Sequence, residues 1–238
     1  MNELFIRNIE IEWDKIDKYS YLNQIDALHS IQTLTFDSPI TFFVGENGTG
    51  KSTLLEAIAI AHGFNPEGGS KNYNFSTKDT HFELCSAIKI VRGSKKESWG
   101  YFLRAESFYN VATYEEQVCA GSNVQSKKYH EKSHGESFIE VAFDNMTDGG
   151  LYIFDEPEAA LSSERQLSLL IQIYQSAKEG SQFIIASHSP ILLGIPNAQI
   201  YSFDNGTIQE CNYEETESYK ITELFLNHRE NFLKKLLD

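Results

Sequence analysis

Cysteine is scarce in this sequence, and the residues that occur form no pair of the CxxC type. Cys85, Cys119 and Cys211 are far apart and odd in number. This pattern is typical of reduced thiols and argues against a disulfide framework or a zinc site. Basic residues are also few, with 20 Lys and Arg against 34 Asp and Glu and a net charge of −14. This balance argues against broad, unaided binding to nucleic acid, which normally needs a basic face.

Long apolar runs are missing as well. No stretch approaches the ~20 consecutive apolar residues that a membrane helix needs. The opening MNELFIRNIEIEWDK alternates like a strand and carries acidic residues early, which is not the pattern of a signal peptide. We therefore expect a cytoplasmic protein, and its 238 residues suit one α/β domain with a modest insertion.

Apolar periodicity predicts strands and helices in an α/β order. Strands are expected over 4–13, 33–36, 40–44, 151–155 and 182–187, and helices over 52–63, 107–121, 135–146, 162–179 and after Pro190. The stretches FELCSAIKIVRG and SWGYFLRAE alternate on either side of GSKKE and predict a hairpin. A second, closing hairpin is expected to turn at Asn205–Gly206.

We divide the single domain of residues 1–238 into three parts. The core is expected over 1–63 and 147–213, an antiparallel and helical insert over about 64–146, and a C-terminal helix over about 219–237. That helix carries one apolar stripe, formed by Ile221, Phe225, Phe232 and Leu236. A partner helix is one candidate to cover this stripe, but we favour packing on the helix's own domain.

GENGTGKST, residues 45–53, matches the pattern G-x-x-x-x-G-K-[ST] between an apolar strand and a helix. Its glycines let the backbone curl so that N–H groups face phosphate oxygens, and the helix adds its positive end. Lys51 is expected to reach the β- and γ-phosphates, and the Ser52 hydroxyl to ligate Mg²⁺. A chance glycine turn is the alternative, which the order strand, motif, helix disfavours. The predicted nucleotide-binding residues are Gly45, Glu46, Asn47, Gly48, Thr49, Gly50, Lys51, Ser52 and Thr53.

LYIFDEPEAALS, residues 151–162, is an apolar strand that ends in two adjacent carboxylates. A strand parallel to the first would bring Asp155 beside the phosphate loop as a second Mg²⁺ ligand. Because the chain turns at the strand end, Glu156 can swing toward the γ-phosphate and polarise an attacking water. A further strand, QFIIAS, leads to His188, whose imidazole is placed to donate to a γ-phosphate oxygen. A solvated acidic turn and a structural histidine are the alternatives. We predict Lys51, Glu156 and His188 as catalytic residues.

The order of GENGTGKST, SHGES, DEPEAALS and ASHSP resembles the ABC-type ATPase heads, which include transporter nucleotide subunits and the SMC and recombination-repair ATPases. Nearly the whole chain is similar to small stand-alone bacterial AAA-family ATPases of that superfamily. The resemblance implies a P-loop NTPase fold with a mostly parallel central sheet flanked by helices. It also implies an antiparallel β element, a small helical subdomain, and ATP and Mg²⁺ as cofactors.

In that class two heads pair head to tail, and the ATP on one phosphate loop is capped by the other's signature, normally LSGGQ. By resemblance, Ser133, Gly135 and Glu136 of KSHGE match that signature, and the same residues also suit a helix cap. His134 departs from the family's glycine, and Ser162 from its usual aspartate after the second carboxylate. Glu106 stands roughly where the family has a Q-loop glutamine.

The leading functional hypothesis is an ATPase, ATP plus water giving ADP and phosphate. ATP-driven homodimerisation would act as a switch coupled to a nucleic-acid or effector-protein partner. One alternative is the energising subunit of a transporter, although RAESF replaces the usual coupling loop. Another is a P-loop kinase of a small metabolite, which the adjacent Asp–Glu pair and His188 disfavour because they suit water as acceptor.

Overall fold

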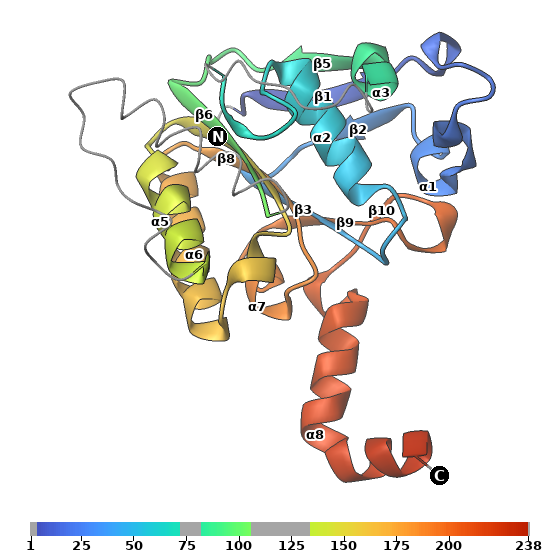
Figure 1. The fold of residues 1–238 in the computed structure, drawn as a ribbon, viewed down its shortest axis with the longest axis vertical. Helices are drawn as coiled ribbons and strands as arrows, with labels where there is room; N and C mark the ends of the chain where they lie inside the picture. Colours follow the sequence, from blue (N-terminus) through green and yellow to red (C-terminus); the bar gives the residue numbers. More distant parts are fainter. Residues whose placement is uncertain (1–3, 72–81, 106–133, 238) are drawn as a thin grey trace.

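The computed structural model describes residues 4–71, 82–105 and 134–237, which form two sheets with helices between and beside them (Figure 1). In these residues the larger sheet has the strand order β10-β9-β3-β8-β7-β6-β4. The five strands from β9 to β6 are parallel, and the edge strands β10 and β4 are antiparallel to their neighbours. The bounds are β3 Ile40–Val44, β4 Gly69–Ser70, β6 Trp99–Arg104, β7 Gly150–Asp155, β8 Gln182–Ala186, β9 Gln199–Ser202 and β10 Gln209–Glu210.

The smaller sheet is antiparallel, in the order β2-β1-β5. Its strands are β1 Ile6–Ile11, β2 Thr33–Thr35 and β5 Ile88–Arg92. Gln182 of β8 links the two sheets, because its side-chain oxygen accepts the N–H groups of Phe5 and Ile6 at 2.8 and 2.9 Å. Its amide nitrogen donates back to the Ile6 carbonyl at 2.9 Å. A mostly parallel central sheet beside an antiparallel element is the arrangement that the resemblance implies, but the antiparallel sheet takes β1 and β2 from residues 1–63, which were assigned to the core, and only β5 from the stretch 64–146.

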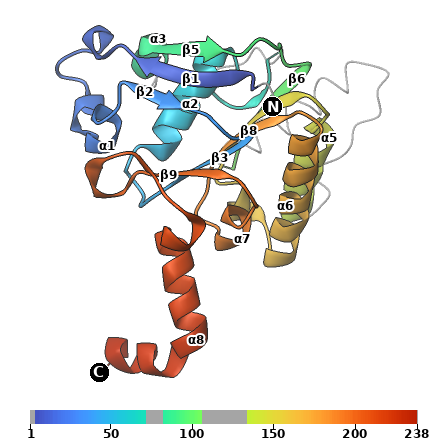
Figure 2. The same ribbon diagram turned by 180° about the vertical axis from the view of Figure 1, so that it is seen from behind.

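Helices cover both faces of the large sheet. The helix α2 lies between the two sheets, while α5 and α6 cover the opposite face (Figures 1 and 2). Neighbouring residues of β3 enter different cores: Phe43 packs on the α2 side and Phe42 on the α5 and α6 side. Burial on both faces explains why this strand is a continuous apolar run. The helices are α1 Asp26–His29, α2 Lys51–His62, α3 Phe82–Ala87, α5 His134–Asn145, α6 Ser163–Lys178, α7 Pro190–Leu193 and α8 Glu217–Leu237.

The predicted hairpin of residues 82–106 is wrong. β5 pairs with β1 in the small sheet, whereas β6 pairs with β7 and β4 in the large sheet. The segment FELCSA is the helix α3, which packs on α2 and buries Leu84 and Ala87 one turn apart. Alternation identifies a strand but not its partner, and short apolar segments are ambiguous between helix and strand. One consequence is that β6, inside the stretch 64–146 assigned to an insert, is a strand of the central sheet.

The closing hairpin is confirmed, since β9 and β10 are antiparallel partners around a turn that contains Asn205, in the left-handed region at φ 59°. The expectation that the last helix packs on its own domain is wrong: α8 has no buried residue and extends away from the sheets in both views (Figures 1 and 2). The helix predicted over 107–121 lies outside the described residues. Within the parts of the chain that the structure describes, no helix has the length and apolar character needed to cross a bilayer.

Candidate functional site

The glycine-rich loop connects β3 to α2, and Lys51 is the first residue of that helix. The Lys51 side chain is buried and folds back over the loop, where its ammonium donates to the carbonyls of Gly45 and Glu46 at 2.6 and 2.7 Å. Burial lowers the pKa of Lys51, and the nearby carboxylates of Glu156 and Asp204 oppose this shift. The loop therefore holds one cation close to its own backbone, at the edge of the sheet.

Two glycines of the loop are required by its shape. Gly45 has φ 137°, and a Cβ there would lie 2.9 Å from the Asp204 carboxylate. Gly50 has φ 96°, and a Cβ there would lie 2.9 Å from the side chains of Ile25 and Leu28. Both positions combine a left-handed conformation with close neighbours, so a larger residue would displace the loop. The curled backbone predicted from the motif is present.

The end of β7 lies directly against the start of α2. The Ser52 hydroxyl donates to the Asp155 carboxylate at 2.8 Å. A hydroxyl and a carboxylate side by side suit Mg²⁺, a hard cation that usually takes one or two protein oxygens and completes its shell with phosphate oxygens and water. Within the described residues there is no cluster of three or more His, Cys, Asp or Glu that would hold a metal without such a ligand. Arg104, at the end of β6, lies 3.8 Å from Asp155 and 3.1 Å from Glu56 of α2.

Glu156 adopts a left-handed backbone conformation, φ 47° and ψ 52°, which is uncommon for a residue other than glycine. Its N–H donates to the Ala186 carbonyl at 2.9 Å, so the turn is fixed to the end of β8. The Nε2 atom of His188 lies 3.7 Å from the Glu156 carboxylate. The side chains of His188 and Glu156 are 40% and 41% exposed. Burial and the Lys51 cation lower the pKa of His188, while Glu156 opposes that shift. A neutral imidazole and a carboxylate thus stand together at the solvent-facing edge.

Two carboxylates that the sequence analysis did not select support this arrangement. Glu158, in the turn Pro157–Ala160, accepts the backbone N–H of His188 at 2.5 Å, and burial raises the pKa of its carboxyl. Asp204, after β9, accepts the backbone N–H of Glu46 at 3.0 Å. Asp204 belongs to a sequence that reads as an ordinary hairpin turn, and no local pattern relates it to the loop. Glu158 follows the Asp–Glu pair closely, which is the only sequence signal that it has.

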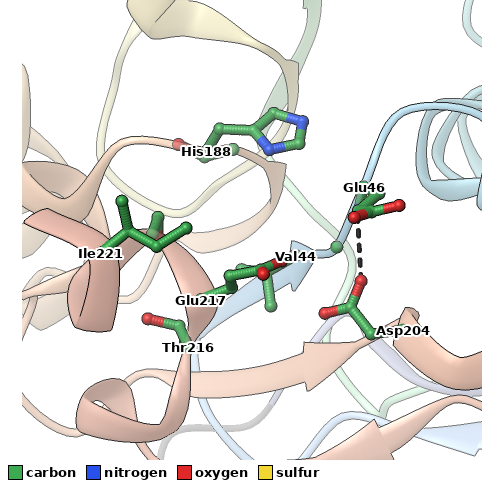
Figure 3. A pocket seen from close by; sticks show the side chains of 10 residues that line it. Val44, Glu46, His188, Asp204, Thr216, Glu217 and Ile221 are labelled. Carbon is green, nitrogen blue, oxygen red and sulfur yellow. Dashed lines mark hydrogen bonds between the residues drawn. The ribbon is translucent and has the colours of Figure 1, made fainter. Parts of the chain in front are cut away.

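A pocket of about 210 Å³ lies beside these residues (Figure 3). His188 stands on one side of it and Glu46 and Asp204 on the other, and Thr216 and Ile221 close the remaining side (Figure 3). Thr216 directly precedes α8, and Ile221 belongs to it. The glycine-rich loop, the end of β8 and the start of the last helix therefore share one cavity.

The other predicted nucleotide-binding residues lie in the glycine-rich loop and in the first turn of α2. Asn47 and Gly48 are exposed at the loop tip, and the Thr49 hydroxyl donates to the Glu46 carbonyl at 2.8 Å. Thr53 lies half-buried in the first turn of α2. The loop residues, Asp155, Glu156 and His188 are thus gathered at the carboxyl ends of three adjacent strands, β3, β8 and β7.

Of the residues matched to the signature, Gly135 and Glu136 lie at the start of α5. Gly135 is in its first turn, and the exposed Glu136 forms an ion pair of 3.0 Å with Arg165 of α6. Ser133 lies outside the described residues. Ser162, at the position where the resemblance leads one to expect aspartate, caps α6 by accepting the N–H of Arg165 at 3.4 Å. The structure therefore places Glu136 on α5, apart from the loop that holds Lys51.

A protein-family model described as "AAA domain" matches residues 21–234. The ABC transporter G family member STR2 of Medicago truncatula is 24% identical to this chain over a match that covers 74% of the chain. The chain spans only 27% of the length of that relative. Among solved structures, cbiO1 from Clostridium perfringens, part of the ABC transporter complex cbiONQ, has a TM-score of 0.50 at 16% identity, covering 98% of this chain and 100% of that one. The SMC head domain from Thermotoga maritima has a TM-score of 0.45 at 11% identity, covering 88% and 99%. At 16% identity the likeness to cbiO1 concerns the fold alone.

Proposed function

The chain belongs to the AAA domain family, whose model matches residues 21–234, and on this premise we propose that it is an ABC-type ATPase that hydrolyses ATP to ADP and phosphate. The observation that carries the proposal is the 2.8 Å contact between the Ser52 hydroxyl and the Asp155 carboxylate. It joins the glycine-rich loop to the acidic strand end at one point, as binding of a Mg²⁺–nucleotide requires.

Each residue has a role that follows from its position. When nucleotide binds, the Lys51 ammonium exchanges its hydrogen bonds to the loop carbonyls for contacts with the β- and γ-phosphates. The N–H groups of the loop donate hydrogen bonds to the phosphate oxygens. Ser52 and Asp155 would hold Mg²⁺, which would supply positive charge to neutralise the phosphates. Glu156 accepts a hydrogen bond from the attacking water and polarises it. His188, kept neutral by its lowered pKa, donates from one ring nitrogen to a γ-phosphate oxygen.

We further propose that ATP brings two copies together head to tail. Glu156 and His188 are each about 40% exposed, so the γ-phosphate side of the site is open in a single chain. The start of α5, with Gly135 and Glu136, would close it from the second copy, adding helix N–H groups and the Ser133 hydroxyl. Because both copies complete such a site, ATP hydrolysis is coupled to opening of the dimer. A nucleic-acid or effector-protein partner can respond to that opening.

Mixing two inactive chains tests this function. In a Glu156→Gln background, Lys51→Ala removes the cation that faces the phosphates, and Ser133→Arg places a cation at a helix N-terminus, where the dipole disfavours it. Light scattering with ATP should show neither variant dimerising alone. The mixture should recover part of the dimer, because one composite site retains both Lys51 and Ser133. If Ser133→Arg alone dimerises as its parent does, residues 133–136 are a helix cap and the head-to-tail arrangement is wrong.

A transporter's energising subunit is a second candidate, favoured by the match to a plant protein named as an ABC transporter family member. The identity is 24%, and the match covers 27% of that protein. The two candidates share the same ATPase site and differ in the partner. Proteins that co-purify with the Glu156→Gln chain decide between them: a membrane protein would favour the transporter, and a nucleic acid or other protein the switch.

A further inference from the structure

The helix α2 buries a carboxylate in an otherwise apolar stretch. Glu56 stands between Leu55 and Ala57 and is only 4% exposed. Glutamate is almost never buried to this extent unless a cation accompanies it. Glu56 lies four residues after Ser52, one turn along the same face of the helix. A buried negative charge thus lies one turn from a proposed Mg²⁺ ligand, and the fold must balance it.

Arg104 supplies a balancing cation from the end of the strand β6. Its Nη1 atom lies 3.1 Å from the Glu56 carboxylate. The same nitrogen donates to the Pro66 carbonyl at 3.2 Å, in the segment that follows α2. A guanidinium is planar and carries its N–H donors in a rigid fork, so two fixed partners also fix the direction of the rest of the group.

Strand pairing places the same side chain beside Asp155. Arg104 and Asp155 are the last residues of β6 and β7 and are partners in the parallel ladder. Phe102 and Ile153, two positions earlier on these strands, pack in the core on the α2 side. Because side chains alternate along a strand, the two strand-end charges face α2 as well. The Nε atom of Arg104 lies 3.8 Å from Oδ2 of Asp155, an ionic contact that is longer than a hydrogen bond.

The two oxygens of Asp155 therefore have different neighbours. Oδ1 accepts the Ser52 hydroxyl at 2.8 Å, and Oδ2 faces Arg104. The torsion that turns an aspartate carboxylate has broad energy minima, so the groups around the carboxylate set its orientation. A cation held on the Oδ2 side keeps Oδ1 toward Ser52, where the proposed Mg²⁺ site lies.

The charge of Arg104 is balanced by that of Glu56, so the pair changes the orientation of Asp155 more than the net charge around it. Lys51 also acts on this edge, together with the carboxylates of Asp155, Glu156, Glu158 and Asp204. An arginine without a carboxylate partner would repel Mg²⁺ and oppose the benefit of orientation. The pairing of Arg104 with Glu56 removes most of that repulsion.

We propose that Arg104 is a positioning residue for Mg²⁺ binding: held by Glu56 and the Pro66 carbonyl, it keeps the Asp155 carboxylate aligned with the Ser52 hydroxyl. The proposal rests on the proposed function, because it needs the Mg²⁺–nucleotide site, and it adds two side chains that act on the metal through Asp155. Groups that orient a metal ligand are typically worth about 10–100-fold in metal affinity. The Mg²⁺ requirement of nucleotide binding should therefore depend on Arg104, whereas binding of metal-free nucleotide should not.

A Mg²⁺ titration of nucleotide binding tests this role. In the Glu156→Gln background, where hydrolysis is slow, a fluorescent ATP analogue reports binding first in EDTA and then at rising Mg²⁺. Arg104→Lys keeps the positive charge but replaces the fork by a single ammonium, which cannot hold Glu56, Pro66 and Asp155 together. The Mg²⁺ concentration at half-saturation should rise by about tenfold or more, while binding in EDTA stays as in the parent.

A second variant removes the charge pair as a whole. Glu56→Gln combined with Arg104→Gln keeps the net charge of the chain and leaves neither member of the pair buried without the other, so the chain should fold. Its Mg²⁺ half-saturation should rise as in Arg104→Lys, because orientation is lost although the charge balance is kept. A fall in the Mg²⁺ requirement of either variant would mean that Arg104 acts by repulsion, and would overturn the proposal.

Two controls accompany these variants. Lys71→Gln removes the cation from another buried carboxylate, Glu97, which contacts His62 at the far end of α2. It should lower the melting temperature and leave the Mg²⁺ half-saturation unchanged. Asp155→Asn removes the proposed metal ligand itself and should lose most of the Mg²⁺ dependence.

The outcomes separate the positioning role from the function on which it rests. If Mg²⁺ does not strengthen nucleotide binding by the parent, or if Asp155→Asn responds as the parent does, the Mg²⁺ site and the role of Arg104 are both overturned. If these two chains behave as expected while Arg104→Lys and the double variant keep the parent's half-saturation, the positioning role is overturned and the proposed function stands. A lowered melting temperature with that unchanged half-saturation would make Glu56 and Arg104 a structural pair only.

Discussion

The Ser52 hydroxyl donates a 2.8 Å hydrogen bond to the Asp155 carboxylate across 103 positions of the sequence. One residue lies in the first turn of the helix after the glycine-rich loop, and the other ends a strand two places away in the sheet from the strand before that loop. Parallel strands bring their carboxyl ends to the same edge, so the contact follows from topology and not from sequence proximity. The fold thereby holds together the two side-chain oxygens that we propose as Mg²⁺ ligands.

Removing the Ser52 hydroxyl should reduce Mg²⁺-dependent turnover. We expect Ser52→Ala to lower the ATPase rate by more than about tenfold, the equivalent of at least one hydrogen bond to a charged group. Ser52→Thr retains the hydroxyl and should keep most of the activity. Steady-state phosphate release over a Mg²⁺ titration measures both. Equal rates for the Ala and Thr variants would remove Ser52 from the metal site.

Glu156→Gln should bind ATP as the parent does and hydrolyse it slowly. An amide still accepts a hydrogen bond from water but polarises it poorly, and loss of a positioned base typically costs about 10²–10⁴-fold in rate. Single-turnover hydrolysis and equilibrium ATP binding, measured on the same preparation, separate the two effects. A rate near that of the parent would assign the catalytic base to another residue.

His188→Ala should slow hydrolysis with little change in ATP affinity, because the imidazole acts on charge that develops during the reaction. Loss of one such donor costs about 10²–10³-fold. The side chain is 40% exposed, so folding should be unaffected, and His188→Gln, which keeps an N–H donor, should recover part of the rate. A lowered melting temperature with an unchanged rate would mean that His188 has a structural role.

Acid should destabilise the protein through a buried pair away from the site. The His62 ring is buried, 3.0 Å from Glu97, which also accepts a hydrogen bond from Lys71 at 2.5 Å. Burial and the Lys71 cation lower the pKa of His62 to about 4 from its ordinary 6.5. Burial alone would raise the pKa of Glu97, but the hydrogen bond from Lys71, a backbone hydrogen bond and the charges of His62 and Lys71 together outweigh it and hold the pKa at about 2.

The unfolded chain therefore takes up a proton at His62 between pH 6.5 and about 4 that the folded chain excludes. The free energy of unfolding should be highest above pH 6.5 and fall by about 3 kcal/mol toward pH 4. A further loss should follow between pH 4.5 and about 2, where the unfolded chain takes up a proton at Glu97 that the folded chain excludes. His62→Gln should flatten the first part of the curve in denaturant titrations at each pH. An unchanged slope in that variant would trace the acid sensitivity to other groups.

The local sequence was sufficient to predict a structural feature wherever the physical cause of that feature is itself local. The loop shape depends on glycines at left-handed positions, as at Gly45 and Gly50, and the motif specifies them directly. The carboxylates of the strand end and His188 follow apolar runs, and a parallel sheet collects such ends at one edge. For these reasons the mostly parallel fold and the residues gathered at its edge could be predicted from the sequence.

Only the tertiary structure decided which distant segments meet. Alternation marked β5 and β6 as strands, but their separation into two sheets depends on the partners β1 and β7, far away in the chain. Asp204 looked like a turn residue until the fold placed its carboxylate on the N–H of Glu46. The apolar stripe of α8 specified a helix with a face to bury, but periodicity does not say against what, and the domain leaves that face exposed. Apolar periodicity and sequence motifs are properties of a single segment, whereas strand pairing and side-chain burial are set by the packing of the whole chain.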